Sequence, residues 1–130
     1  MKNLQIFCLS LNPLHKNLID KLGYTPVGLG SNIFSESWLS DKSENNISLK
    51  NQFYGEYTFH YWLWKNHLDK LDEGWFGFCQ YRKFWGKNTL LGNNINIFDF
   101  KDIVKTDISN EDDMYESIIG TPIHINQFKL

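Results

Sequence analysis

Residues 48–85 read SLKNQFYGEYTFHYWLWKNHLDKLDEGWFGFCQYRKFW, and this stretch decides how the fold is interpreted. It holds all but one of the five tryptophans of the chain. Aromatic residues at helical spacing predict a helix that begins at Leu49, with Ser48 as its N-cap. Residues 72–74 then predict a turn, and the continuous apolar run at 75–79 is typical of a central strand. We therefore expect a buried helix, a tight turn and a buried strand.

The residues before this stretch predict the start of a βαβ unit. Residues 4–11 are almost continuously apolar, as in a strand that is buried on both faces. Leucines at a four-residue spacing predict a short helix over about 14–22, with Gly23 as its C-terminal cap. A second strand is expected at about 25–29. This order predicts an α/β fold with a mainly parallel sheet flanked by helices.

The remaining segments give weaker signals. Residues 31–46 and 86–96 read as polar loops, and the first of these is either a functional lid or a mobile segment. Short strands are expected around residues 103–104 and over 117–120. Ser109 with Asp112 resembles a capping box for a short acidic helix. Another helix is expected to begin within 123–130.

Composition limits the class of protein. The chain has 130 residues, which fits one domain, and a net charge of -2, which gives no electrostatic footprint for nucleic acid. We find no signal-peptide cleavage site and no apolar run long enough to span a membrane. Cys8 and Cys79 are expected to be buried, reduced thiols. The sequence predicts a cytoplasmic protein, with a position at the cytoplasmic face of the membrane as the alternative.

Polar residues follow two of the predicted strands. In open parallel sheets, ligands bind beyond the carboxyl ends of the strands. Ser10, Asn12, His15 and Lys16 follow the first strand, and Gln80, Tyr81, Arg82 and Lys83 follow the later one. An arginine fork and a lysine suit phosphate, and aromatic rings stack on a base or a sugar. The alternative is a surface Arg-Lys pair beside packing aromatics.

Glu56 and His60 lie one helical turn apart and are the candidate catalytic pair. This spacing allows joint metal ligation or acid–base chemistry, and the alternative is a hydrogen bond on the helix surface. Asp41, Asp99 and Asp102 are further carboxylates, but none belongs to an Asp-x-Asp pair that would hold a divalent ion on a diphosphate. Dependence on a divalent metal therefore stays open.

Two long motifs resemble a bacterial family of long-unassigned, glycosyltransferase-like domains from capsule and exopolysaccharide loci. The family pattern NIS-x-KN-xx-YCELT-xx-YW-x-WKN is similar to residues 46–66, and its GLCHYRRYF strand is similar to residues 77–85. The IIGTPIHIN stretch near the end of the chain also looks like a later segment of some members. Here Gly55 replaces a cysteine, Gln80 a histidine and Lys83 an arginine.

The resemblance implies a Rossmann-like fold of the GT-A type and sugar transfer from a nucleotide-sugar donor to a saccharide or lipid-linked saccharide during surface-polysaccharide synthesis. It also implies a longer domain than this chain, so we expect the donor-side portion. Beside the catalytic pair, the expected substrate-binding residues are Lys50, Asn51, Lys65, Asn66, Gln80, Tyr81, Arg82 and Lys83. The alternative is a non-catalytic module that binds nucleotide-sugars or serves in assembly, as a truncated remnant of such an enzyme.

Overall fold

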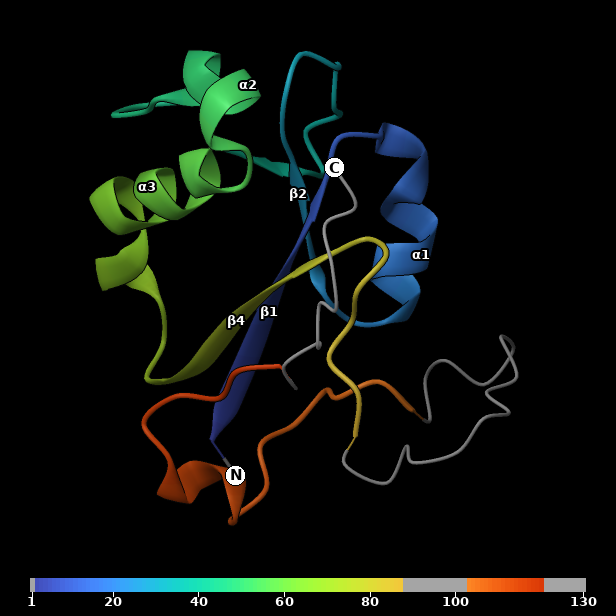
Figure 1. Cartoon of the computed structure of the whole chain (residues 1–130), viewed down its shortest axis with the longest axis vertical. Helices are drawn as coiled ribbons and strands as arrows, with labels where there is room; N and C mark the ends of the chain where they lie inside the picture. The colour runs from blue at the N-terminus through green and yellow to red at the C-terminus, as the bar shows by residue number, and fades with distance from the viewer. Residues whose placement is uncertain (1, 88–102, 121–130) are drawn as a thin grey trace, which may run out of the picture.

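The computed structural model describes residues 2–87 and 103–120, and these residues build a parallel sheet between helices (Figure 1). The four strands lie in the order β3-β2-β1-β4, and every pairing between them is parallel. Their bounds are β1 Asn3–Ser10, β2 Thr25–Gly28, β3 Leu39–Ser40 and β4 Gly74–Gln80. The predicted α/β class with a Rossmann-like parallel sheet is confirmed.

Strand β1 is the centre of the sheet, because it pairs with β2 on one side and with β4 on the other. Its alternating side chains divide the core in two, as the pleat of a strand requires. Ile6 and Cys8 join one cluster, and Phe7 and Leu9 join the other. The prediction that β4 is a central strand is wrong for the described sheet, in which β4 forms one edge.

Helices cover the two faces of the sheet. The 3₁₀ turn η1 (Pro13–His15) leads into α1 (Lys16–Lys21), which buries Ile19 in the cluster around Ile6. On the opposite face, α3 (Tyr57–Asn66) packs Phe59, Trp62 and Leu63 into the cluster around Phe7. Gly23 has a φ of 73° and its N–H bonds to the carbonyl of Asp20, so it ends the first helix as predicted.

The single helix predicted from Leu49 is instead three pieces. A 3₁₀ turn, η2 (Ser48–Lys50), leads into α2 (Asn51–Tyr54), and α3 follows after a corner at Gly55. Gly55 has φ 54° and ψ -130°, a conformation that glycine adopts far more readily than other residues. Ser48 is not an N-cap, because its hydroxyl donates to Asn46 Oδ1 at 2.8 Å.

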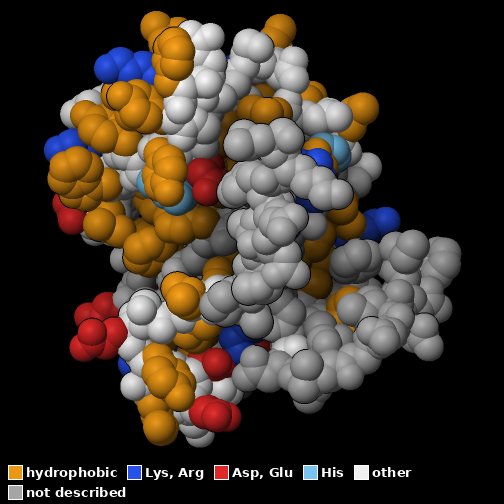
Figure 2. Space-filling view, viewed as in Figure 1, with side chains coloured by type: hydrophobic (Ala, Val, Ile, Leu, Met, Phe, Trp, Pro, Cys, Tyr) orange, Lys and Arg blue, Asp and Glu red, His pale blue; other side chains and the backbone are white. Residues whose placement is uncertain are grey.

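The expectation of a helix buried on several sides is also wrong. Only one side of α3 meets the sheet, so the other side carries exposed aromatics. On α3, Tyr57 is 64% exposed and Trp64 60%, and in the two pieces before it Leu49 is 94% exposed and Phe53 78%. Figure 2 shows hydrophobic side chains gathered at the surface over α2 and α3.

Residues 31–46 are more ordered than a simple polar loop. They contain β3 and the buried ring of Trp38. Asn45 and Asn66 exchange two hydrogen bonds, with Asn66 Nδ2 donating to the Asn45 carbonyl at 2.8 Å, and Trp62 donates to the Ser43 carbonyl at 3.1 Å. These bonds fasten the segment to α3.

The predicted capping box is confirmed, since the Ser109 and Asp112 side chains each accept the other's backbone N–H at the start of η5 (Asp112–Met114). The prediction of a strand over 117–120 is wrong, because Ile119 is 82% exposed and these residues join no β-ladder in the described structure. Val104 makes only an isolated bridge to Gly86. Most of the loop predicted at 86–96 and all of the helix predicted within 123–130 lie outside the described residues.

Cys8 and Cys79 face each other across β1 and β4, and both are buried and free, as predicted. A hydrogen bond with Cys8, together with burial, raises the pKa of the Cys79 thiol above its ordinary value. No helix in the described ranges is long and apolar enough to cross a membrane.

Candidate functional site

A cavity of about 750 Å³ opens at the carboxyl edge of the sheet. Its walls come from the residues that end β1 and β4, from Leu29 after β2 and from the corner between α2 and α3. This is the edge at which parallel α/β sheets bind ligands. The polar or aromatic side chains among its lining residues are those of Ser10, Asn12, His15, Asn51, Gln52, Tyr54, Glu56, Gln80, Tyr81 and Arg82.

The wall after β1 is held by a compact set of hydrogen bonds. Ser10 Oγ lies 2.7 Å from His15 Nδ1 and accepts the backbone N–H of Asn12 at 3.0 Å. Asn12 Oδ1 in turn accepts the N–H of Leu14 at 2.9 Å, which starts the η1 turn. These bonds fix the His15 ring against the cavity.

The wall after β4 places an arginine beside an aromatic stack. Tyr81 stacks on His15 with 3.9 Å between ring centroids and 19° between ring planes. The guanidinium of Arg82 lies 5.1 Å from the centre of the Tyr81 ring. Arg82 is exposed and takes part in none of the ion pairs found within residues 2–87 and 103–120. Its positive charge is therefore available to an anionic ligand.

The corner between α2 and α3 places a carboxylate opposite that arginine wall. Glu56 Oε2 accepts a hydrogen bond from Gln80 Nε2 at 2.8 Å. Asn51 Nδ2 donates to the Gly55 carbonyl at 2.9 Å and to Thr58 Oγ1 at 3.1 Å, and these bonds fix the corner. Within the described part of the chain Glu56 Oε1 has no hydrogen-bond partner, so it can accept one from a ligand hydroxyl.

The structure brings together one half of the predicted site residues. Those that line the cavity are Asn51, Glu56, Gln80, Tyr81 and Arg82, and those that do not are Lys50, His60, Lys65, Asn66 and Lys83. Lys65 Nζ lies 3.5 Å from the centre of the Trp64 ring, and Asn66 is bonded to Asn45. Lys50 and Lys83 are exposed.

His60 packs beneath the site rather than in it. Its ring lies 4.1 Å from that of Phe78, and its Nε2 atom is buried without a hydrogen-bond partner. Burial lowers the pKa of His60, although the nearby Glu56 carboxylate acts in the opposite direction. No hydrogen bond joins these two described side chains, so the geometry keeps His60 neutral and apart from the cavity.

Gln52 and Tyr54 line the cavity but were not expected there. Their positions depend on the Gly55 corner, and helical spacing alone gives no signal for it. Asp41, which follows β3, is fully buried, and neither of its carboxylate oxygens has a hydrogen-bond partner in the described structure. No three of the described His, Cys, Asp and Glu residues come together as a metal site.

These features define a parallel α/β domain with a polar and aromatic cavity at the carboxyl edge of its sheet. A family model described as "Domain of unknown function (DUF4422)" matches residues 11–125, so the chain belongs to this family. No curated protein and no solved structure matches the chain.

Proposed function

We propose that the cavity binds a nucleotide-sugar and that the domain acts as a glycosyltransferase in bacterial surface-polysaccharide synthesis. The observation that carries the proposal is the Arg82 guanidinium, which has no ion-pair partner among the described residues and lies beside the Tyr81–His15 stack at the ligand-binding edge of a parallel sheet. The volume of about 750 Å³ lies within the usual range for small-molecule sites. The resemblance of residues 46–66 and 77–85 to glycosyltransferase-like domains supports the same function.

In this proposal Arg82 holds the diphosphate of the donor. A guanidinium forks onto two phosphate oxygens and keeps its charge at every working pH. As the bond between the sugar and the diphosphate breaks, negative charge grows on the leaving oxygen, and a fixed cation stabilises it. The overall charge of the chain is -2, so attraction of the donor depends on this local cation.

Glu56 has the second role, on the sugar side. Gln80 holds one carboxylate oxygen, and Oε1 is left to accept a hydrogen bond from a sugar hydroxyl. A carboxylate in that position either orients the donor sugar or takes the proton from the acceptor hydroxyl. The acceptor is a saccharide or a lipid-linked saccharide, and the reaction takes place in the cytoplasm or at the cytoplasmic face of the inner membrane.

A non-catalytic nucleotide-sugar-binding module is the second candidate. The contact that favours it is the Glu56–Gln80 hydrogen bond, which fixes the only carboxylate among the described residues that line the cavity. A carboxylate held in this way suits recognition of a ligand as well as chemistry.

Purified protein incubated with a panel of UDP-, GDP-, CDP- and dTDP-sugars tests both candidates. Calorimetry measures binding, and a coupled assay measures release of the nucleoside diphosphate, each with Mg²⁺, with Mn²⁺ and with a chelator. Binding with release that Glu56→Gln abolishes supports the transferase. Binding without release for every donor and acceptor supports the module, and absence of binding contradicts both.

A further inference from the structure

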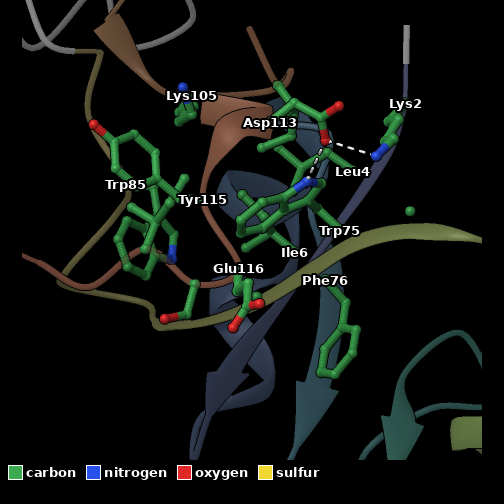
Figure 3. Close-up of a pocket in the computed structure, with 15 residues that line it drawn as sticks. Lys2, Leu4, Ile6, Trp75, Phe76, Trp85, Lys105, Asp113, Tyr115 and Glu116 are labelled. Atoms are coloured by element: carbon green, nitrogen blue, oxygen red, sulfur yellow. Dashed lines mark hydrogen bonds and ion pairs between the residues drawn. The ribbon is translucent and has the colours of Figure 1, made fainter. Parts of the chain in front are cut away.

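A second cavity, of about 480 Å³, lies near the opposite edge of the sheet. Its floor is formed by the first residues of β1 and β4, and its walls by Trp85 and by residues between Lys105 and Ile118 (Figure 3). Along β4 the lining of this cavity ends at Gly77 and that of the first cavity begins at Gln80, so about 10 Å of strand separates the two linings. The two cavities share no lining residue.

Four aromatic side chains, those of Trp75, Phe76, Trp85 and Tyr115, line this second cavity, and the two indoles are held in place. The Trp75 indole N–H donates to Asp113 Oδ1 at 3.1 Å, and the Trp85 indole N–H donates to the Phe78 carbonyl at 2.9 Å. Tyr115 is 58% exposed and lies near Trp85 (Figure 3). A Cβ at Gly77 would lie 3.7 Å from Trp85 Nε1, an ordinary van der Waals distance, so the indole packs over this part of β4. A ligand therefore meets fixed aromatic surfaces.

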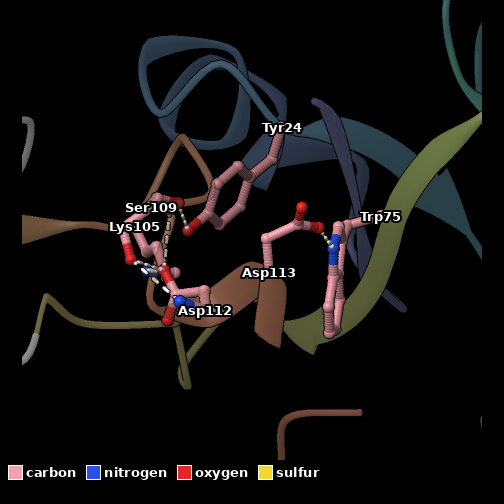
Figure 4. Close-up of polar contacts among 6 residues, drawn as sticks. All are labelled: Tyr24, Trp75, Lys105, Ser109, Asp112 and Asp113. Atoms are coloured by element: carbon pink, nitrogen blue, oxygen red, sulfur yellow. Dashed lines mark hydrogen bonds and ion pairs between the residues drawn. The ribbon is translucent and has the colours of Figure 1, made fainter. Parts of the chain in front are cut away.

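Most of the charged groups that line this cavity are already paired with a group of opposite charge. Lys2 pairs with Asp113 at 2.9 Å, and Lys105 pairs with Asp112 at 2.6 Å (Figure 4). Both lysines that line the cavity thus have carboxylate partners, which makes it a poor site for phosphate. Hydrogen bonds from Lys2 and from Trp75 lower the pKa of Asp113, so this carboxylate is an ionised acceptor. Glu116 adds a second, exposed carboxylate.

We propose that this second cavity binds an uncharged sugar residue of a saccharide chain. Sugar hydroxyls donate to ionised carboxylates, here those of Asp113 and Glu116. The apolar C–H face of a pyranose packs on an aromatic ring, here Tyr115 or one of the fixed indoles. Among the described residues that line this cavity, both lysines are paired with carboxylates, so none offers a nucleotide an unpaired cation for its phosphates.

The site holds a sugar that does not itself react. Because the two cavities lie at opposite ends of the sheet and share no lining residue, a sugar bound here belongs to another part of the saccharide chain, and its binding anchors the polymer on the domain. The inference does not rest on transfer activity, because saccharide binding here needs neither Arg82 nor Glu56.

Saturation-transfer NMR tests the inference. The probes are the disaccharides maltose, lactose and cellobiose and the methyl glycosides of glucose, galactose, mannose and N-acetylglucosamine. We compare wild type with Tyr115→Ala and Glu116→Gln, both at exposed positions that the fold tolerates. Trp64→Ala removes an exposed ring on α3 that lines neither cavity and is the matched control.

The expected result is transfer to at least one probe that falls several-fold in Tyr115→Ala and in Glu116→Gln, persists in Trp64→Ala and is not displaced by UDP or GDP. Absence of transfer to every probe overturns the inference. So does transfer that both variants retain, or that a nucleotide abolishes. Saccharide binding without any nucleotide binding would keep this inference and contradict the proposed function.

Discussion

Arg82 and Lys83 are neighbours in the sequence, and their surroundings differ. Arg82 lines the carboxyl-edge cavity and lies against Tyr81, whereas Lys83 is exposed and outside the cavity lining. The sequence assigns both to phosphate binding, because it gives their order after β4 and not the direction of each side chain. This pair therefore provides a matched test.

Arg82→Ala weakens binding of a nucleoside diphosphate by about 10- to 100-fold, since a hydrogen-bonded charge pair contributes about 1.5 to 3 kcal/mol. Calorimetry gives this ratio, and the melting temperature stays unchanged because Arg82 is exposed and unpaired within the described chain. Lys83→Ala keeps wild-type affinity. Equal losses in the two variants would place the phosphate outside the cavity.

Asp41 differs from Arg82 and Lys83, because its carboxylate is buried and has no partner among the described residues. It is fully buried, and neither oxygen has a hydrogen-bond partner in the described structure. An unpaired buried carboxylate is costly, so the neutral isostere in Asp41→Asn raises the free energy of unfolding at neutral pH by about 1 to 3 kcal/mol. Urea denaturation measures the change, with the exposed Asp72→Asn as control. A destabilised Asp41→Asn would mean that the carboxylate has a charged partner.

Among the helices and strands, long apolar or periodic patterns predicted the elements well. Single residues that interrupt an element were not recognised from the sequence. The apolar runs at residues 4–11 and 75–79 predicted the positions of β1 and β4 closely, but burial on both faces holds for β1, whereas Cys79 is the only buried residue of β4. The corner at Gly55 was missed because the aromatic spacing continues across it. Strand β3 was missed because two residues give no pattern.

Gly74 controls the start of β4. Its φ is 152°, and a Cβ there would lie 2.4 Å from the backbone oxygen of Asn3 on the paired strand. Since backbone cannot move aside without breaking the ladder, Gly74→Ala lowers the free energy of unfolding by about 2 to 3 kcal/mol. Chemical denaturation checks this value. Gly120→Ala, which meets nothing within 4 Å, leaves stability unchanged. Wild-type stability for Gly74→Ala would contradict the pairing of Gly74 with Asn3.

The capping box at η5 makes the free energy of unfolding depend on pH in the acid range. Hydrogen bonds from the Lys105 side chain and from Ser109 lower the pKa of Asp112 from 3.8 to about 2. A lowered folded-state pKa stabilises the fold above the unfolded value, and this contribution is lost as the pH falls from about 4 to about 2. Solvent screening reduces its size to about 1 kcal/mol.

Asp112→Asn therefore costs about 1 kcal/mol at neutral pH and nothing near pH 2, because asparagine still accepts the Ser109 N–H but loses the ion pair with Lys105. Denaturation across this pH range shows the two curves converging. Asp107→Asn, an exposed neighbour outside these contacts, runs parallel to wild type. A constant difference between Asp112→Asn and wild type at all pH values would contradict the assignment.

At the scale of the whole molecule, topology brings the site together. The strand ends predicted eight polar or aromatic residues at one edge, because parallel strands share their carboxyl edge. Six of them line the cavity, namely Ser10, Asn12, His15, Gln80, Tyr81 and Arg82, whereas Lys16 and Lys83 do not. Lys50, Lys65 and Asn66 lie in the same motif as Asn51 and Glu56 but outside the cavity, and motif order alone does not tell which face of the helices each occupies. The cavity formed by Trp75, Trp85 and Tyr115 joins residues far apart in sequence, so no local pattern predicts it.

The most direct measurement is an amide NMR titration of the labelled protein with UDP and with GDP. We predict that one of them shifts amides of residues 10–12, 51–52, 54–56 and 80–82, which line the carboxyl-edge cavity, and leaves those of residues 74–76 and 113–117 unchanged. Shifts centred on the second cavity, or none with either nucleotide, would contradict it.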